Sequence, residues 1–219
     1  MHQLSVALLL AAAVTALHSD GDRTLACGQS ETTALRDAPG SVRRVSKGRL
    51  AIRWAGGTRV FRDTGVVEGE LGGTAYEYCG PVLGYHLIRK VEAGLSTGVL
   101  LDTATGSLLP AGQAVMFAPD GRRYFATQQP DGLDGEEWLV YSRAGTRLWK
   151  GQSGITMKSS HGGYDYFVAT LEAPHWTSAG ELSATLRCAS DRARTAAVTL
   201  RATPGRYAWT PAVHCAPVS

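Results

Sequence analysis

The sequence predicts an all-β fold built of antiparallel hairpins. Residues 99–150 contain three short apolar runs, each followed by a tight turn and a second apolar run, and the turns end at Gly106, Gly121 and Gly145. Aromatic and β-branched runs separated by Asp-Gly or a similar pair are typical of β-hairpins. After residue 17, no long stretch repeats apolar residues with the helical period of about 3.6 residues. We therefore expect little helix.

The other expected strands follow in chain order. Residues 49–54 alternate polar and apolar side chains, Gly56 and Gly57 form a turn, and residues 58–61 return, which is a hairpin pattern. Further strands are expected at residues 76–79, 85–88, 164–171, 181–188, 196–201 and 207–209. Residues 46–219 are expected to form a single all-β domain, because a chain of about two hundred residues can bury one good core.

The N-terminus has the pattern of a secretory signal peptide. Residues 4–17 are uncharged and mostly apolar. This run is shorter than the roughly twenty residues that a membrane-spanning helix needs, and it matches the apolar region of a signal peptide. Val14 and Ala16 predict cleavage after Ala16, so that residues 1–16 are removed; a buried N-terminal helix is the alternative. Residues 17–45 are polar and rich in turn-forming residues, and we expect an extended segment there.

Residues 24–27 (Thr-Leu-Ala-Cys) faintly resemble the cleavage box of a lipoprotein, in which the cysteine is acylated. However, the polar residues 18–23 separate this box from the apolar run, and Thr24 stands where leucine is expected. We therefore expect Cys27 to form a disulfide and the chain to have no lipid anchor. No later segment reaches the length of a membrane span.

Four cysteines follow the signal peptide: Cys27, Cys79, Cys188 and Cys215. An even number in an exported chain predicts two disulfides, for which three pairings are possible. Their positions along the chain favour Cys27–Cys79 and Cys188–Cys215. No pair has the C-x-x-C spacing of a redox motif, and no histidine lies at zinc-finger spacing. We expect the protein in the periplasm or outside the cell.

The charge pattern argues against a nucleic-acid surface. The chain contains 22 Lys and Arg and 19 Asp and Glu, which gives a net charge of +3. We expect these charges to be spread along the chain, because no basic run exceeds two residues and aromatic residues are not interleaved with a charged stripe. DNA and RNA are therefore not the expected partners.

Several common catalytic signatures are absent from the sequence. It contains no S-x-x-K or H-E-x-x-H motif and no phosphate-binding glycine loop, and residues 151–154 (GQSG) lack the spacing of a nucleophile elbow. These absences favour a non-enzymatic protein, and we predict no catalytic residue, cofactor or metal ion. Residues 160–165 contain Ser, His and Asp, but neighbouring residues on a strand point to opposite faces, so a triad would need partners from elsewhere. His86 lies inside an apolar strand and is expected to be structural.

An acidic loop lies between two of the expected strands. Asp131, Asp134 and Glu136 could hold calcium, but their spacing does not match that of an EF-hand loop. We expect a solvated turn at this position.

Two hairpin sequences resemble the repeats of bacterial β-propellers. Residues 117–126 (FAPDGRRYFA) are similar to the Phe-Ser-Pro-Asp-Gly-Lys/Arg pattern of that family, in which the Pro-Asp-Gly turn joins two strands of one blade. Residues 100–106 (LLDTATG) resemble a strand and turn of such blades. The resemblance implies a small propeller of four or five units, because the usual six to eight blades exceed this length. A repeat of about forty residues does not extend over both ends, and a β-sandwich or an incomplete propeller-like stack is the alternative.

Four residues are the candidates for a binding surface. His175 and Trp176 lie in an expected loop after Pro174, and Tyr164 and Trp138 are further aromatic candidates. Trp and Tyr are enriched at the centres of protein–protein contacts. The alternative for Trp176 is that its ring packs on the core.

These observations predict an exported, non-enzymatic, β-rich binding protein whose partner is another protein. Inhibitors, and immunity proteins that neutralise a toxin delivered to the cell envelope, are the expected type. The alternative is an envelope hydrolase or a carbohydrate-binding protein whose site is built from dispersed Asp, His and Trp residues.

Overall fold

The computed structural model describes residues 23–65, 72–129, 136–157, 166–204 and 206–216. Strands account for 63 % and helix for 4 % of these residues, which confirms the all-β fold class. The elements are β1 (Thr24–Ala26), α1 (Glu31–Arg36), β2 (Val42–Ser46), β3 (Arg49–Trp54), β4 (Gly57–Arg62), β5 (Thr74–Val82), β6 (Tyr85–Glu92), β7 (Leu95–Asp102), β8 (Leu108–Ala111), β9 (Ala114–Phe117), β10 (Arg123–Gln128), β11 (Glu137–Ser142), β12 (Arg147–Gln152), β13 (Gly154–Met157), β14 (Tyr166–Trp176), β15 (Leu182–Cys188), β16 (Thr195–Thr203) and β17 (Arg206–Thr210).

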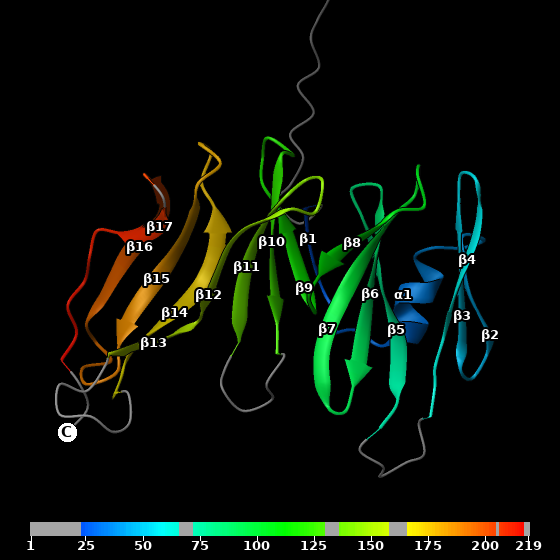
Figure 1. Cartoon of the computed structure of the whole chain (residues 1–219), viewed down its shortest axis with the longest axis horizontal. Helices are drawn as coiled ribbons and strands as arrows, with labels where there is room; N and C mark the ends of the chain where they lie inside the picture. Colours follow the sequence, from blue (N-terminus) through cyan, green and yellow to red (C-terminus); the bar gives the residue numbers. More distant parts are fainter. Residues whose placement is uncertain (1–22, 66–71, 130–135, 158–165, 205, 217–219) are drawn as a thin grey trace, which may run out of the picture.

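The strands form four antiparallel sheets that succeed one another along the chain. The first sheet is β2-β3-β4, the second is β5-β6-β7-β8, the third is β1-β9-β10-β11-β12 and the fourth is β13-β14-β15-β16-β17. Only β1 leaves the chain order, because it pairs with β9 at the edge of the third sheet. The sheets lie side by side along the long axis of the molecule, with the first and fourth at its two ends (Figure 1).

Consecutive sheets pack face to face around three hydrophobic cores. The third sheet contributes to two of them, because neighbouring residues of a strand point to opposite faces. Tyr124 and Leu139 pack toward the second sheet, whereas Phe125, Trp138 and Val140 pack toward the fourth. An interior strand is therefore apolar on both faces, which explains the continuous apolar run of residues 138–141.

Part of the N-terminal segment that we expected to be extended is helical. Helix α1 begins after Ser30, whose side chain accepts a hydrogen bond from the Thr33 amide, and Ala34 is fully buried in the first core. Ser30 is a favoured N-cap residue, and Glu31 in the first turn suits the helix dipole. These short-range features were present in the sequence, but a helix of six residues has too few turns to show a periodic pattern.

The hairpin turns that resemble propeller repeats have well-defined local causes. In the β9–β10 turn, Asp120 Oδ1 accepts from the Arg122 amide, and Gly121 has a φ of +65°. In the β7–β8 turn, Asp102 Oδ1 accepts from the amides of Ala104 (2.8 Å) and Thr105 (2.9 Å). These backbone donors, with that of Thr105 contributing most, lower the pKa of Asp102. The expected hairpins at these two positions are confirmed.

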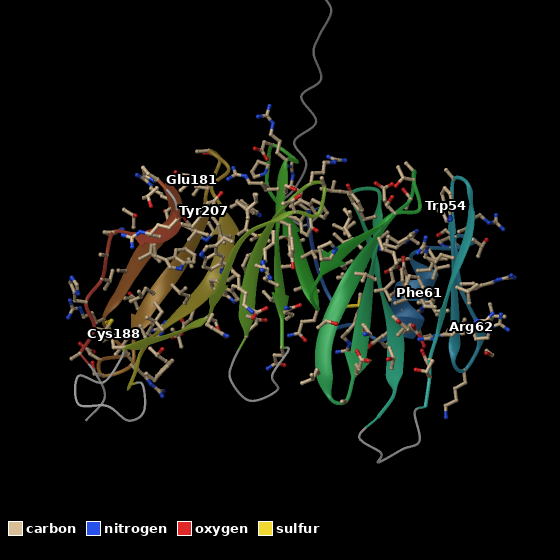
Figure 2. All side chains as sticks on the ribbon, viewed as in Figure 1. Trp54, Phe61, Arg62, Glu181, Cys188 and Tyr207 are labelled. Atoms are coloured by element: carbon tan, nitrogen blue, oxygen red, sulfur yellow. A yellow bond between two sulfur atoms is a disulfide. The ribbon has the colours of Figure 1, made fainter. Side chains whose placement is uncertain are left out.

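Tryptophan 54 contacts the second sheet from the end of β3 (Figure 2). Its ring lies so close to Gly106 that a Cβ atom at this glycine would stand 2.6 Å from the indole. Gly106 also has a φ of +71°, a conformation that other residues rarely adopt. The propeller-like turn therefore needs glycine for both space and backbone conformation.

Both disulfides join the pairs that the sequence favoured. Cys27–Cys79 ties the chain after β1 to β5, and Cys188–Cys215 ties the end of β15 to the chain after β17. Closing loops of 52 and 27 residues each restricts the unfolded chain and contributes about 3–4 kcal/mol in the chain-entropy treatment. No helix in the described part of the chain is long and apolar enough to cross a membrane.

Candidate functional site

Two of the four residues predicted to form a binding surface lie at the end of β14. His175 is exposed, and its Nδ1 atom lies 3.1 Å from the carbonyl oxygen of Ala173. Trp176 is half-buried: its indole N–H donates to the Met116 carbonyl (2.9 Å), and the Arg123 guanidinium lies 5.5 Å from its ring centroid. Because Met116 and Arg123 belong to the third sheet, Trp176 links the third and fourth sheets.

Of the other two predicted residues, Trp138 does not belong to this surface. Trp138 is only 1 % exposed, and its ring makes edge contacts with Phe125 and Trp209 in the core between the third and fourth sheets. Its indole N–H donates to Glu136 (3.0 Å), one of the acidic residues considered for calcium. Tyr164 lies outside the described residues, as do Asp131, Asp134 and the Ser-His-Asp segment at 160–165. The structure therefore places Trp138 in the core, away from any surface where a partner could bind.

His86 is buried, and its interactions are structural, as expected. Its Nδ1 atom forms a hydrogen bond of 2.8 Å with the Tyr78 hydroxyl, and both side chains lie between the first and second sheets. Burial lowers the pKa of His86, and burial followed by the charge of Asp37 raises the pKa of Tyr78. The hydrogen bond thus joins two buried side chains inside the protein.

The first sheet presents a different kind of surface. Leu50, Ile52 and Phe61 point into the core, so that the alternate residues of the three strands point away from it. Figure 2 shows this alternation on β4, where Phe61 lies on the side of α1 and Arg62 on the other side. We call the outward side the cationic face; it consists of Arg43, Arg49, Ala51, Arg53, Thr58, Val60 and Arg62.

The positive charge of the chain is concentrated in this sheet. Residues 38–62 contain seven Lys and Arg and no Asp or Glu. Since the whole chain has 22 cationic and 19 anionic side chains, the remainder carries 15 and 19, a net charge of −4. The expectation of evenly spread charge is therefore wrong for the first sheet. Because residues alternate between the two faces of a strand, other residues separate most of these arginines in the sequence, and no basic cluster is visible there. The feature of the sequence that reveals the cluster is the absence of any acid over 25 residues.

The arginines of the cationic face are not neutralised by nearby acids. Arg44, on the core side of β2, forms ion pairs with Glu31 (2.8 Å) and Asp63 (3.9 Å). No ion pair to an arginine of the cationic face occurs among the described residues. Arg49 even stands directly opposite Arg62 in the β3–β4 register, and like charges at such positions destabilise a sheet.

A hollow of about 280 Å³ lies within this surface. It is lined by Gly40, Ser41, Val42, Arg43, Ala51, Arg53 and Thr58. The small side chain of Ala51 is directly opposite Arg43 in the β2–β3 register, and Arg53 follows two residues later on the same face. The guanidinium groups therefore flank a space above Ala51, and guanidinium groups bind carboxylates and other oxyanions with two parallel hydrogen bonds.

The described residues contain no group of three or more His, Cys, Asp or Glu that could hold a metal ion. The arginines of the cationic face can bind anions through their guanidinium groups. Comparison of the chain with protein-family models, with curated proteins and with solved structures finds no match. The resemblance to β-propeller repeats stays a prediction.

Proposed function

We propose that this chain is an exported, non-enzymatic binding protein that holds an acidic partner protein on its cationic face. The observation that carries the proposal is the display of four outward arginines on one sheet whose sequence contains no acid. Inhibitors and immunity proteins, which neutralise another protein by covering it, are the type of binder that we have in mind.

The energetics of the first sheet support a role for these arginines beyond folding. The pair of Arg49 and Arg62 costs stability, because two like charges face each other across the strands. A salt-bridging acid on a neighbouring position would remove this cost, yet residues 38–62 contain none. Carboxylates of a bound partner would supply the missing charge, and charge complementarity of this kind accelerates association and excludes wrong partners.

The composition of the cationic face favours a protein over a nucleic acid. Thr58 and Val60 lie between the arginines, and Val60 is 38 % exposed. Arginine combined with apolar contact area is typical of the central part of protein interfaces. Proteins that bind single-stranded nucleic acids stack bases on aromatic side chains, and none of the residues that define the cationic face is aromatic.

A second copy of this chain is a poor partner for the same surface. Two cationic faces repel each other. The outer side of the fourth sheet is also positive among the described residues, because it carries Arg187, Arg201 and Arg206 against Glu172 and Glu181. Neither end of the molecule therefore provides the negative charge that the cationic face lacks.

Export is part of the proposal. The apolar N-terminal run supports a signal peptide, and the two disulfides suit an oxidising compartment such as the periplasm or the extracellular space. A partner delivered to the same compartment would meet the cationic face there.

The proposal is tested with labelled poly-L-glutamate as a probe for an acidic polypeptide. We expect the disulfide-intact protein to bind this probe at low salt and to lose affinity as NaCl is added, because exposed charges are screened within about 10 Å at 0.1 M salt. The R49E/R62E variant is expected to bind at least about tenfold more weakly, a change of about 1.4 kcal/mol.

The matched control is R147E/R206E, which changes the net charge equally at exposed strand positions of the third and fourth sheets. This variant should bind poly-L-glutamate like the parent chain. Equal losses in the two variants would overturn the proposal, since they would show that net charge and not the cationic face attracts the probe. Tighter binding of a DNA duplex, lost in R49E/R62E alone, would replace the protein partner with a nucleic acid.

A further inference from the structure

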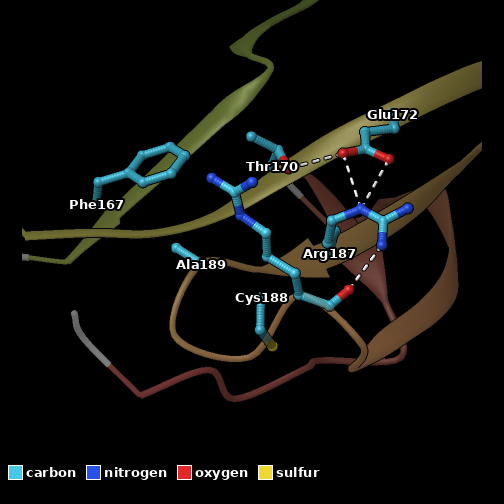
Figure 3. Close-up of a pocket in the computed structure, with 7 residues that line it drawn as sticks. Phe167, Thr170, Glu172, Arg187, Cys188 and Ala189 are labelled. Carbon is cyan, nitrogen blue, oxygen red and sulfur yellow. Dashed lines mark hydrogen bonds and ion pairs between the residues drawn. The ribbon is translucent and has the colours of Figure 1, made fainter.

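The outer side of the fourth sheet contains a pocket of about 610 Å³, at the other end of the molecule from the cationic face (Figures 1 and 3). This volume is in the range of small-molecule binding sites, which is about 300–1,000 Å³. We call it the fourth-sheet pocket; it is lined by Phe167, Thr170, Glu172, Arg187, Cys188, Ala189 and Arg192. Cys188 is held in its disulfide to Cys215, so that the pocket adjoins a covalently fixed part of the fold.

Arg187 is held in place by three acceptors. Its Nε atom lies 3.0 Å from both carboxylate oxygens of Glu172, and its Nη1 atom donates to the Arg192 carbonyl at 2.7 Å (Figure 3). Glu172 is held in turn by the Thr170 hydroxyl at 3.3 Å. The Nη2 atom of Arg187 has no acceptor among the described residues. A guanidinium fixed in this way loses little further freedom when a ligand binds it.

Phe167 provides an apolar wall. Its side chain is 45 % exposed, and Figure 3 shows it across the pocket from Glu172 and Arg187. An exposed aromatic ring opposite hydrogen-bonding side chains suits a sugar, because the C–H groups on one face of a pyranose pack on the ring while its hydroxyls bind polar groups at the edge.

The charge of the fourth-sheet pocket favours an acidic sugar over a neutral one. Its lining contains two arginines, Arg187 and Arg192, and one acid, Glu172, so that it has one positive charge in excess. A ligand with one carboxylate would balance this charge, and guanidinium–carboxylate pairing is the favoured geometry for it. The Glu172 carboxylate accepts hydrogen bonds, so it would bind hydroxyl donors of the same ligand.

Hydroxyl groups continue from the pocket across the sheet. Thr195 is opposite Arg187, Thr185 lies two residues before Arg187 on β15, and Thr199 lies further along β16 on the same face. The Thr199 hydroxyl is hydrogen-bonded at 2.8 Å to the hydroxyl of the buried Ser183. This row of neutral hydroxyls would accompany a polyhydroxylated chain further along the sheet, which favours a polysaccharide over a free monosaccharide.

We propose that the fourth-sheet pocket binds a hexuronic acid residue of an acidic polysaccharide. The carboxylate of the sugar pairs with Arg187 and Arg192, its ring packs on Phe167, and its hydroxyls donate to Glu172. The rest of the polysaccharide follows the hydroxyl row of β15 and β16. This site is separate from the cationic face, so it stands or falls independently of the acidic protein partner.

The test measures binding of tri-galacturonic acid to the whole, disulfide-intact protein by titration calorimetry. Its fully methyl-esterified form is the neutral control, and N-acetylglycine is the control for a carboxylate without a sugar. We expect the acid to bind at least tenfold more tightly than either control. The F167A and R192Q variants should each weaken binding at least fivefold.

Two matched variants serve as controls for this test. M157A also truncates an exposed apolar side chain of the fourth sheet, and R201Q neutralises an arginine that pairs with Glu181 outside the pocket; both should bind the acid like the parent chain. Equal affinity for the acid and its methyl ester, or unchanged binding in F167A and R192Q, would overturn the proposal. Loss of acid binding in R49E/R62E instead would also overturn it, because the cationic face would then be the glycan site.

Discussion

The first and third sheets have the same antiparallel backbone pattern but differ in what their second faces do. In the inner strands β10 and β11 of the third sheet, both faces are buried, and Trp138 and Leu139 point into two different cores. In the first sheet, one face packs on the second sheet through Leu50 and Ile52, and the other carries arginines. The difference follows from position, because the third sheet lies between two neighbours and the first lies at an end.

This comparison separates the residues that stabilise the fold from those that are available to bind a partner. Substitutions on the buried faces of the third sheet should act on stability, whereas those on the cationic face should act on binding. A four-sheet stack has two such outer faces, and they differ: one is cationic around Ala51, and the other has the fourth-sheet pocket and a row of hydroxyls.

The largest expected effect is on the third sheet. Trp138→Ala removes a fully buried ring that contacts Phe125 and Trp209 and leaves the Glu136 carboxylate without its indole donor. We expect the free energy of unfolding to fall by about 3–5 kcal/mol, as for other large-to-small changes in a core. Urea titration followed by circular dichroism measures this change.

Val60→Ala on the cationic face is the counterpart of this substitution. Val60 is 38 % exposed, and we expect a change within about 0.5 kcal/mol, which is usual for surface positions. A loss at Val60 comparable to that at Trp138 would contradict the assignment of the outer face as free surface.

Much of the fold could be predicted from local patterns. The hairpins at 49–61, 101–109 and 115–125 combine apolar runs with turn residues whose backbone preferences act within a few positions, and both disulfide pairs join cysteines that are neighbours along the chain. Helix α1 was missed because six residues show no periodicity. The order in which the sheets stack could not be predicted from the sequence. An inner strand is apolar on both faces, and its sequence does not show which neighbouring sheet each face contacts.

The candidate sites were harder to predict, for a related reason. Tryptophan is common at interfaces, which favours Trp138 and Trp176 as surface residues. However, the same apolar area buries equally well in a core, and only the elements that pack on the strand decide between the two. The cationic face was hidden because its arginines are brought together across strands by the register of β2, β3 and β4. The absence of Asp and Glu from residues 38–62 is visible in the sequence, but it is a property of composition over a window and not of any motif.

An intermediate effect is expected between the first and second sheets, at His86. Burial lowers the pKa of this histidine, so the folded protein keeps it neutral while the unfolded chain binds a proton more readily. Stability is therefore fully present above the unfolded-state pKa of about 6.5 and is lost as the pH falls below it, by at most about 1.4 kcal/mol per pH unit. Unfolding free energies measured between pH 5 and 8 should show this slope.

His86→Gln is the variant that isolates the slope. It keeps a polar partner for the Tyr78 hydroxyl but does not titrate, so its stability should be lower at neutral pH and should change less between pH 7 and 5. His175→Gln, at an exposed position, should retain the slope of the parent chain. A parent chain whose stability is unchanged down to pH 5 would contradict a neutral, buried His86.

The smallest expected effect distinguishes the outer faces of the first and fourth sheets. Arg62→Thr removes one of two guanidinium groups that face each other across β3 and β4 and introduces a residue with high β-propensity. We expect the unfolding free energy to rise by about 0.5 kcal/mol at low salt and the gain to shrink as NaCl screens the repulsion. Arg201→Thr, which breaks the Arg201–Glu181 ion pair of 3.5 Å, should give no such gain. If Arg62→Thr also weakens binding of poly-L-glutamate, stability and binding move in opposite directions at one residue, which is the behaviour of a side chain retained for a partner and not for the fold.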